Sequence, residues 1–150
     1  MTENKISNLS DLKQLAQDTV ARLGARALLL LSGPMGVGKT QFTRFLLDEL
    51  SCDETVSPSF AIHNTYHSRL GNVEHIDLFR LESEADLEST GFWDLFEATE
   101  GIFIIEWADR LSEFGVLDQL PRSWLKISMQ FEFVSGPASE ERRILVVEKY

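Results

Sequence analysis

The chain has 150 residues, 43% of them hydrophobic, which suits one domain with a single core. Its formal net charge of −10 repels RNA, DNA and anionic lipid, so direct nucleic-acid or membrane binding is not expected, whereas a basic protein partner is compatible. The sequence has no apolar run of the roughly 18 residues that cross a membrane, its start is too polar for a secretory signal, and the single Cys52 cannot form an internal disulfide. These features predict a cytoplasmic protein with a single domain over residues 1–150, and they do not indicate its oligomeric state.

A helix and a strand are predicted within the first 31 residues. Apolar residues recur at helical spacing at Leu12, Leu15, Ala16, Val20 and Leu23. Asn8 or Ser10 can cap the start of this helix, and Gly24 can end it. The segment ALLLL at residues 27–31 is apolar throughout, which is typical of a strand buried on both faces of a parallel sheet.

A glycine-rich loop follows this strand, within SGPMGVGKTQF at residues 32–42. The pattern G-x-x-x-x-G-K-[ST] is matched by Gly33, Gly38, Lys39 and Thr40. Such a loop turns backbone N–H groups towards phosphate oxygens, and the helix that begins near Lys39 adds its positive dipole. Lys39 can then reach the β- and γ-phosphates, and the Thr40 hydroxyl can hold Mg²⁺. The predicted nucleotide-binding residues of the loop are Gly33, Pro34, Met35, Gly36, Val37, Gly38, Lys39, Thr40 and Gln41.

The helix after the loop is predicted to turn one apolar side inward, formed by Phe42, Phe45, Leu46 and Leu50. Beyond it, Pro58 disfavours a helix and favours an extended chain. The turn signal SRLGN at 68–72 separates the extended runs 60–66 and 73–79, which are predicted to form a hairpin.

The second half of the chain is predicted to supply the rest of the sheet. GIFIIEW at 101–107 is a buried strand, and ADRLSEF after it is a short helix. Residues 124–133 alternate between apolar and polar, which indicates a half-buried strand, and a turn then leads to a final strand at 142–150. This order predicts an α/β, three-layer P-loop NTPase-like domain with a mixed, partly antiparallel β-sheet.

Carboxylates beside the phosphates are also needed for phosphoryl transfer, to hold the metal and to orient the nucleophile. Glu106 ends the buried strand, and an acid at that place in an α/β sheet points into the crevice where ligands bind. Asp77 ends another extended run, and Glu74 is a weaker third candidate. The alternatives are a helix-start acid for Glu106 and a turn cap for Asp77.

The reaction class has three candidates: an ATPase, a small-molecule kinase, and a nucleotide-dependent interaction module without significant hydrolysis. A small GTPase is not expected, because Asp77 is followed by LFR and does not begin a D-x-x-G motif, and the one Asn-Lys pair, at residues 4–5, lies at the wrong end of the chain. The kinase is weakened because the arginines after Glu106 lie in no evident lid; they are Arg110, Arg122, Arg142 and Arg143.

Two other groups of titratable residues stand out. Residues 81–100 contain seven carboxylates and no Lys or Arg, and they form either a solvated helix face with a loop or a docking face for a basic partner. A zinc site is not expected at His63, His67 and His75. On an extended chain the first two lie roughly 13 Å apart, and no Cys or further His completes a ligand set.

Several separated motifs together resemble the TsaE (YjeE) family, bacterial P-loop ATPases that assist threonylcarbamoyladenosine formation on tRNA beside the anticodon. The matching pieces are GPMGVGKT at 33–40, SPSF at 57–60, HIDLFRL at 75–81 and IEWADRL at 105–111, in the order of the family. The resemblance implies a weak ATPase that uses ATP/ADP and Mg²⁺ and acts with a heterodimer of TsaB and TsaD, in which TsaD performs the carbamoyl transfer.

The resemblance also implies roles for individual residues. Lys39, Asp77 and Glu106 would be catalytic, with Thr40, Asp77 and Glu106 on the magnesium side. Ser57 and Ser59 would belong to a switch that senses the γ-phosphate, and Trp107 would lie beside the nucleotide or the partner interface, with a core position as its alternative. The chain departs from the family at four positions, which carry Pro34, Met35, Ser59 and Phe79 in place of an acidic residue, Leu, Thr and Tyr.

Overall fold

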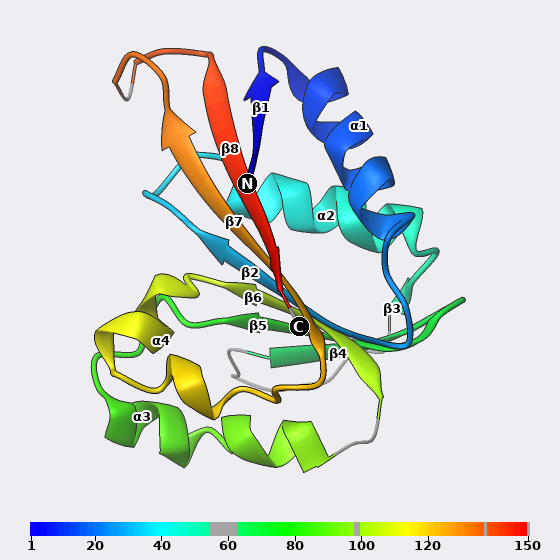
Figure 1. The fold of residues 1–150 in the computed structure, drawn as a ribbon, viewed down its shortest axis with the longest axis vertical. Helices are drawn as coiled ribbons and strands as arrows, with labels where there is room; N and C mark the ends of the chain where they lie inside the picture. Colours follow the sequence, from blue (N-terminus) through cyan, green and yellow to red (C-terminus); the bar gives the residue numbers. More distant parts are fainter. Residues whose placement is uncertain (55–62, 98–99, 137, 150) are drawn as a thin grey trace.

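The computed structural model describes residues 1–54, 63–97, 100–136 and 138–149. One eight-stranded sheet runs through the protein in the order β1-β8-β7-β2-β6-β5-β4-β3 (Figure 1). The strands are β1 (Thr2–Ile6), β2 (Arg26–Ser32), β3 (Asp53–Glu54), β4 (His63–Ser68), β5 (Gly71–Asp77), β6 (Gly101–Glu106), β7 (Leu125–Phe133) and β8 (Arg142–Lys149). The helices are α1 (Leu9–Val20), α2 (Lys39–Glu49), α3 (Glu84–Ser89) and α4 (Asp109–Glu113), with 3₁₀ helices η1 (Phe92–Glu97) and η2 (Leu117–Gln119). In the described part of the chain, no helix is long and apolar enough to cross a membrane.

The centre of the sheet is parallel and its two sides are antiparallel. β2 pairs in parallel with both β7 and β6, and β6 pairs in parallel with β5. β8 and β1 extend one side by antiparallel pairing, and β4 and β3 extend the other. The predicted mixed sheet is therefore confirmed. The register pairs Glu106 with Leu31 on one side and with Asp77 on the other, so the carboxyl ends of β2, β5 and β6 meet at one edge.

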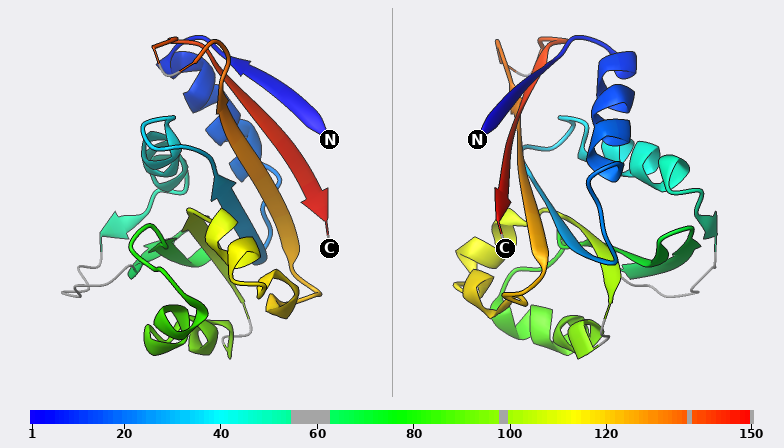
Figure 2. Two further views of the ribbon diagram at one scale, coloured as in Figure 1. Left: turned by 90° about the vertical axis from the view of Figure 1, so that its left-hand side faces the viewer. Right: turned by 45° about the vertical axis from the view of Figure 1, so that its right-hand side comes forward.

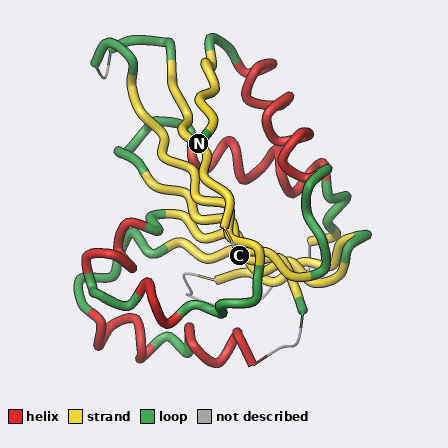
Figure 3. Tube along the Cα trace, viewed as in Figure 1, coloured by secondary structure: helices red, strands yellow, loops and turns green. Residues whose placement is uncertain are grey.

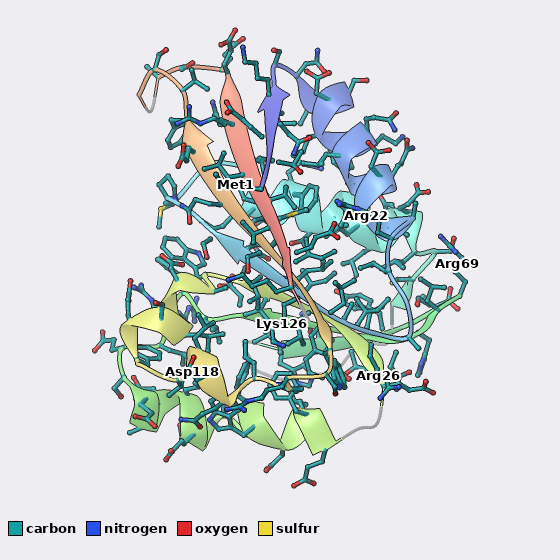
Figure 4. All side chains as sticks on the ribbon, viewed as in Figure 1. Met1, Arg22, Arg26, Arg69, Asp118 and Lys126 are labelled. Atoms are coloured by element: carbon teal, nitrogen blue, oxygen red, sulfur yellow. The ribbon has the colours of Figure 1, made fainter. Side chains whose placement is uncertain are left out.

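Helices cover both faces of the sheet, which confirms the three-layer architecture (Figures 2 and 3). Leu29 and Leu31 of β2 face the core under α1 and α2, whereas Leu28 and Leu30 face the core under α3, η1 and α4. Successive residues of a strand point to opposite faces, so a strand between two cores must be apolar throughout. Arg22, Arg69 and Asp118, which are labelled in Figure 4, are charged and exposed to solvent.

The N-terminal segment differs from expectation in two ways. Residues Thr2–Ile6 form an edge strand paired with β8, which was not predicted. Ile6 is its one buried residue, so the strand is defined by its backbone pairing and leaves no side-chain pattern in the sequence. Asn8 caps α1 as predicted, accepting a hydrogen bond from the Asp11 N–H, but the helix ends at Val20 and not at Gly24. A tight turn follows the helix and buries Leu23. The helical spacing of apolar residues in the sequence therefore continues past the last residue of the helix.

The predicted hairpin is confirmed within the described residues. β4 and β5 pair antiparallel from His63↔Ile76 to Ser68↔Gly71, which gives a shorter turn than SRLGN. The strand β5 ends at Asp77, two residues earlier than expected, because the Asp77 side chain accepts a hydrogen bond from the Phe79 N–H at 2.9 Å and turns the chain. Residues 60–62 and Pro58 lie outside the described residues.

The acidic segment 81–100 contains α3 and η1. Its buried members are apolar, Leu81, Leu87 and Phe92, and they pack against the sheet. Six of its carboxylates are exposed: Glu82, Glu84, Glu88, Asp94, Glu97 and Glu100. This arrangement is that of a solvated helical face, and its use as a docking face stays a prediction.

Candidate functional site

The glycine-rich loop joins the end of β2 to the start of α2 and bends through left-handed backbone at each of its glycines. The φ angles are 142° at Gly33, 77° at Gly36 and 116° at Gly38. Gly38 is the N-cap of α2, and no side chain among the described residues caps it. The first N–H groups of the helix are therefore left for an anion, as the motif predicts.

Lys39 is buried at the base of this loop, with 5% of its surface exposed. Its ammonium donates hydrogen bonds to the Gly33 carbonyl and, at 2.9 Å, to the Pro34 carbonyl, and it lies 4.0 Å from the centre of the Trp107 ring. Burial lowers the pKa of Lys39, although the nearby carboxylates of Asp109, Glu106 and Asp77 act in the opposite direction. Both hydrogen-bond acceptors are neutral carbonyls, and a phosphate would be a stronger, charge-assisted partner for the ammonium.

Glu106 is the most buried acid of the site, with 1% exposed surface. Its Oε1 accepts a hydrogen bond from the Thr40 hydroxyl at 2.8 Å, and its Oε2 contacts the His75 Nε2. Burial raises the pKa of Glu106 and is the largest single influence, but the hydrogen bonds and charges of His75, Thr40 and Lys39 together outweigh it and hold the pKa below its usual range. The carboxylate is thus kept ionised beside the loop threonine.

Asp77 reaches the same site from the neighbouring strand. It lies opposite Glu106 in the register and, with Lys39, Thr40 and Trp107, lines a cavity of about 270 Å³. Its Oδ1 also accepts the Phe79 N–H, so the turn cap that was the alternative explanation is present as well. A carboxylate has further acceptor positions, so capping the turn does not prevent Asp77 from facing a ligand in the cavity.

Trp107 follows Glu106 in a left-handed conformation, with φ at 57°, which is unusual for a bulky residue. Its ring packs against that of Phe79 at a centroid distance of 4.9 Å, with the two planes tilted by 43°, and the Arg110 guanidinium lies 5.4 Å from the centre of the Trp107 ring. Trp107 therefore lines the cavity and, being half-buried, also packs against the core under α3, η1 and α4, so both explanations apply to it. A backbone held in a sparsely populated region at a cavity is a common property of binding sites.

Most of the predicted site residues come together. The cavity is lined by Met35, Gly36, Gly38, Lys39, Thr40, Gln41, Asp77, Phe79 and Trp107. Gly33 and Pro34 contribute carbonyls to Lys39, and Val37 lines an adjoining cavity instead. Ser57 and Ser59 lie outside the described residues. His75 is a site residue that was not predicted, although its position two residues before Asp77 on an extended run places both on one face.

Glu74, the third candidate acid, is not part of the site. Its side chain points away from the loop, where its Oε2 accepts the Thr65 hydroxyl at 2.7 Å and contacts the His63 Nε2. Alternation along β5 explains the outcome, because Glu74 must face the opposite side of the sheet from His75. The three histidines have separate partners, and no group of three or more His, Cys, Asp or Glu side chains that could hold a metal ion occurs among the described residues.

The Glu74 cluster predicts a pH-dependent contribution to stability. Burial raises the pKa of Glu74, but its bonds to His63 and Thr65 outweigh this effect and lower the pKa overall. Its stabilising effect is therefore present above the unfolded pKa of about 4.3 and lost as pH falls through the folded value. We expect Glu74→Gln to lower the free energy of unfolding by about 1–2 kcal/mol at pH 6, and this difference should shrink below pH 4, measured by urea unfolding. The exposed Glu88→Gln is the control, and a constant difference across pH would contradict the prediction.

The comparisons with known proteins agree on one family. The family model "Threonylcarbamoyl adenosine biosynthesis protein TsaE" matches residues 6–142. A Bacillus subtilis protein described as "tRNA threonylcarbamoyladenosine biosynthesis protein TsaE" is 32% identical over 121 residues, covering 80% of this chain and 72% of that protein. A Nostoc protein with the same description is 37% identical, covering 59% of this chain and 57% of that protein.

A solved structure has a similar fold. The crystal structure of Bacillus subtilis YdiB is 26% identical and superposes with a TM-score of 0.69, covering 99% of this chain and 84% of that one. The family match over most of the chain confirms the resemblance seen in the sequence. The loop and Asp77 line one cavity, and Glu106 accepts a hydrogen bond from Thr40 in the lining of that cavity. The chain belongs to the TsaE family of proteins of tRNA threonylcarbamoyladenosine biosynthesis.

Proposed function

We propose that the protein hydrolyses ATP with Mg²⁺ in the cytoplasm and thereby supports a TsaB–TsaD pair in forming threonylcarbamoyladenosine on tRNA next to the anticodon. The observation that carries the proposal is the hydrogen bond of 2.8 Å that the Thr40 hydroxyl donates to the ionised Glu106. Lys39 lies directly before Thr40, at the start of α2. A hydroxyl, a strand-end carboxylate and a loop lysine in one place are the parts that a P-loop site requires.

The residues of the site fit ATP and Mg²⁺. Thr40, Asp77 and Glu106 offer the oxygen ligands that Mg²⁺ prefers, and the metal would neutralise charge on the phosphates. The N–H groups of the loop and the first turn of α2 would hold the phosphate oxygens, while Lys39 would exchange its two carbonyl partners for phosphate. Glu106 would also orient the attacking water.

The adjoining cavity is where the adenine base of ATP would fit. It has a volume of about 380 Å³, shares Gly36, Gly38 and Gln41 with the first cavity, and is walled by Leu9 and Leu12. Its apolar wall suits an aromatic ring, while Ser7, Asn8 and Arg142 supply polar groups at its edge. We propose that the adenine lies here, against the segment before α1, with the phosphates on the loop.

Hydrolysis of ATP by the pure protein, alone and with a TsaB–TsaD pair, tests the proposal. We expect slow turnover alone that rises when the pair is added and that vanishes in Glu106→Ala. Turnover indifferent to the pair, with phosphate transferred to an added metabolite, would favour the kinase. Tight binding of ATP or ADP without turnover in either condition would favour the interaction module.

A further inference from the structure

Glu106 has its two carboxylate oxygens committed to different elements of the fold. Oε1 accepts the Thr40 hydroxyl at the start of α2, and Oε2 contacts the His75 Nε2 on β5. The side chain of Glu106 is 2% exposed and that of His75 is 18% exposed. A carboxylate buried to this degree needs a partner for each oxygen, since an unsatisfied buried acceptor is costly.

The sheet explains why His75 is the residue that makes this contact. In the parallel pairing of β5 with β6, Asp77 lies opposite Glu106 and His75 lies opposite Ile104. His75 and Asp77 share one face of β5 because they are two residues apart. The strand β5 therefore places the carboxylate of Asp77 at the nucleotide cavity and, two residues earlier, the ring of His75 in contact with Glu106.

We propose that His75 is a positioning residue, which holds Oε2 of Glu106 through a hydrogen bond and so keeps Oε1 directed at Thr40 and the magnesium side of the site. The inference rests on the proposed function, because it assigns His75 a role in metal-dependent nucleotide binding. The hydrogen bond, and not a positive charge, is what the role requires. Groups that orient a ligating carboxylate typically change metal affinity when they are removed.

A pair of amide variants separates the hydrogen bond from other effects. The amide nitrogen of Gln extends about as far from the backbone as Nε2 of His, whereas the amide of Asn is one methylene shorter. His75→Gln can therefore restore a donor to Oε2, and His75→Asn cannot reach it, although both are neutral and polar. His75→Ala removes the side chain altogether.

The measurement is the dissociation constant of ADP by calorimetry, with Mg²⁺ and with EDTA. The wild type should bind ADP more tightly with Mg²⁺. His75→Asn and His75→Ala should lose about 10–100-fold of this advantage, and His75→Gln should keep it within about three-fold. Equal values for all variants, or a Gln variant as weak as Ala, would overturn the inference. A wild type that gains nothing from Mg²⁺ would instead overturn the proposed function, and the inference would fall with it.

A measurement on the wild type removes any dependence on how well the variants fold. Because an ionised carboxylate can only accept, His75 Nε2 must carry a proton if it positions Glu106. Nitrogen NMR of histidine-labelled protein should show a protonated Nε2 at His75, with the resonance assigned by its loss in His75→Gln or, if that variant does not fold, by sequential backbone assignment. A bare Nε2, with the proton on Nδ1 alone, would overturn the inference.

Discussion

Replacing Lys39 with Met is expected to lower kcat/KM for ATP hydrolysis by about 10²–10³-fold, the effect of removing one preorganised group that stabilises transition-state charge. Met keeps most of the length of the side chain but removes the ammonium that would reach the phosphates, together with its cation–π contact with the Trp107 ring. Hydrolysis would be measured with Mg²⁺·ATP as phosphate release, with the TsaB–TsaD pair present. Turnover at the wild-type rate would remove the loop from the mechanism.

The same substitution should leave the thermal unfolding midpoint close to that of the wild type. Burial lowers the pKa of Lys39 despite the carboxylates near it, so folding disfavours the charged form. The penalty is full below the folded pKa, declines as pH rises above it, and is gone only above the unfolded pKa of about 10.4. Removing the charge removes this penalty together with the bonds to Gly33 and Pro34. Lys39 is therefore expected to serve ATP hydrolysis without adding to the stability of the fold, which is a common compromise at functional sites.

Lys126→Met is the matched control for both measurements. Lys126 lies on β7, burial lowers its pKa as well, and its ammonium donates to the Trp124 carbonyl at 3.3 Å. It lines neither of the two cavities assigned to the nucleotide. Its replacement should therefore leave hydrolysis unchanged, and a loss as large as that of Lys39→Met would show that the assay reports a general effect of removing a buried lysine.

The parts of the fold that the sequence predicts are those in which burial leaves a pattern. The ALLLL run identifies β2 because a strand between two cores must be apolar on both faces, and the alternation of 124–133 identifies β7 because one of its faces is covered. β1 leaves no such pattern. It is an edge strand whose side chains are mostly exposed, and its backbone pairing with β8 depends on a partner more than a hundred residues away.

The residues of the candidate site also fall into those that the sequence predicts and those that only the fold brings together. Lys39 and Thr40 are predictable because loop, dipole and phosphate chemistry are local in the chain. Asp77 and Glu106 are predictable as strand ends, since parallel strands deliver their carboxyl ends to one edge. The contact between His75 and Glu106 depends on which strands are neighbours, and alternation alone excludes Glu74 only after the face of β5 is known. The left-handed backbone of Trp107 has no signal in the sequence.

Gly33→Ala should cause the largest loss of stability among the loop glycines. A Cβ at Gly33 would lie 2.5 Å from the carbonyl oxygen of Phe131, and its φ of 142° is one that residues with side chains rarely adopt. Phe131 belongs to β7, which is hydrogen-bonded to β2 on one side and β8 on the other, so the obstructing carbonyl cannot move away. Strain and overpacking together predict a loss of about 2–5 kcal/mol in the free energy of unfolding.

Gly36→Ala separates the cost of the left-handed backbone conformation from the cost of the close contact with Phe131. Gly36 also has a left-handed φ, of 77°, but a Cβ there would meet no atom within 4 Å among the described residues. It should lose only the conformational part, about 1–2 kcal/mol. Both variants would be compared with the wild type by urea unfolding. If both variants lost equal stability, the contact with Phe131 would have no energetic weight. A larger loss at Gly33 would mean that β7, through one backbone carbonyl, sets where the loop leaves β2, and that the carbonyls of Gly33 and Pro34, which hold Lys39, are placed by the sheet rather than by the loop's own turns.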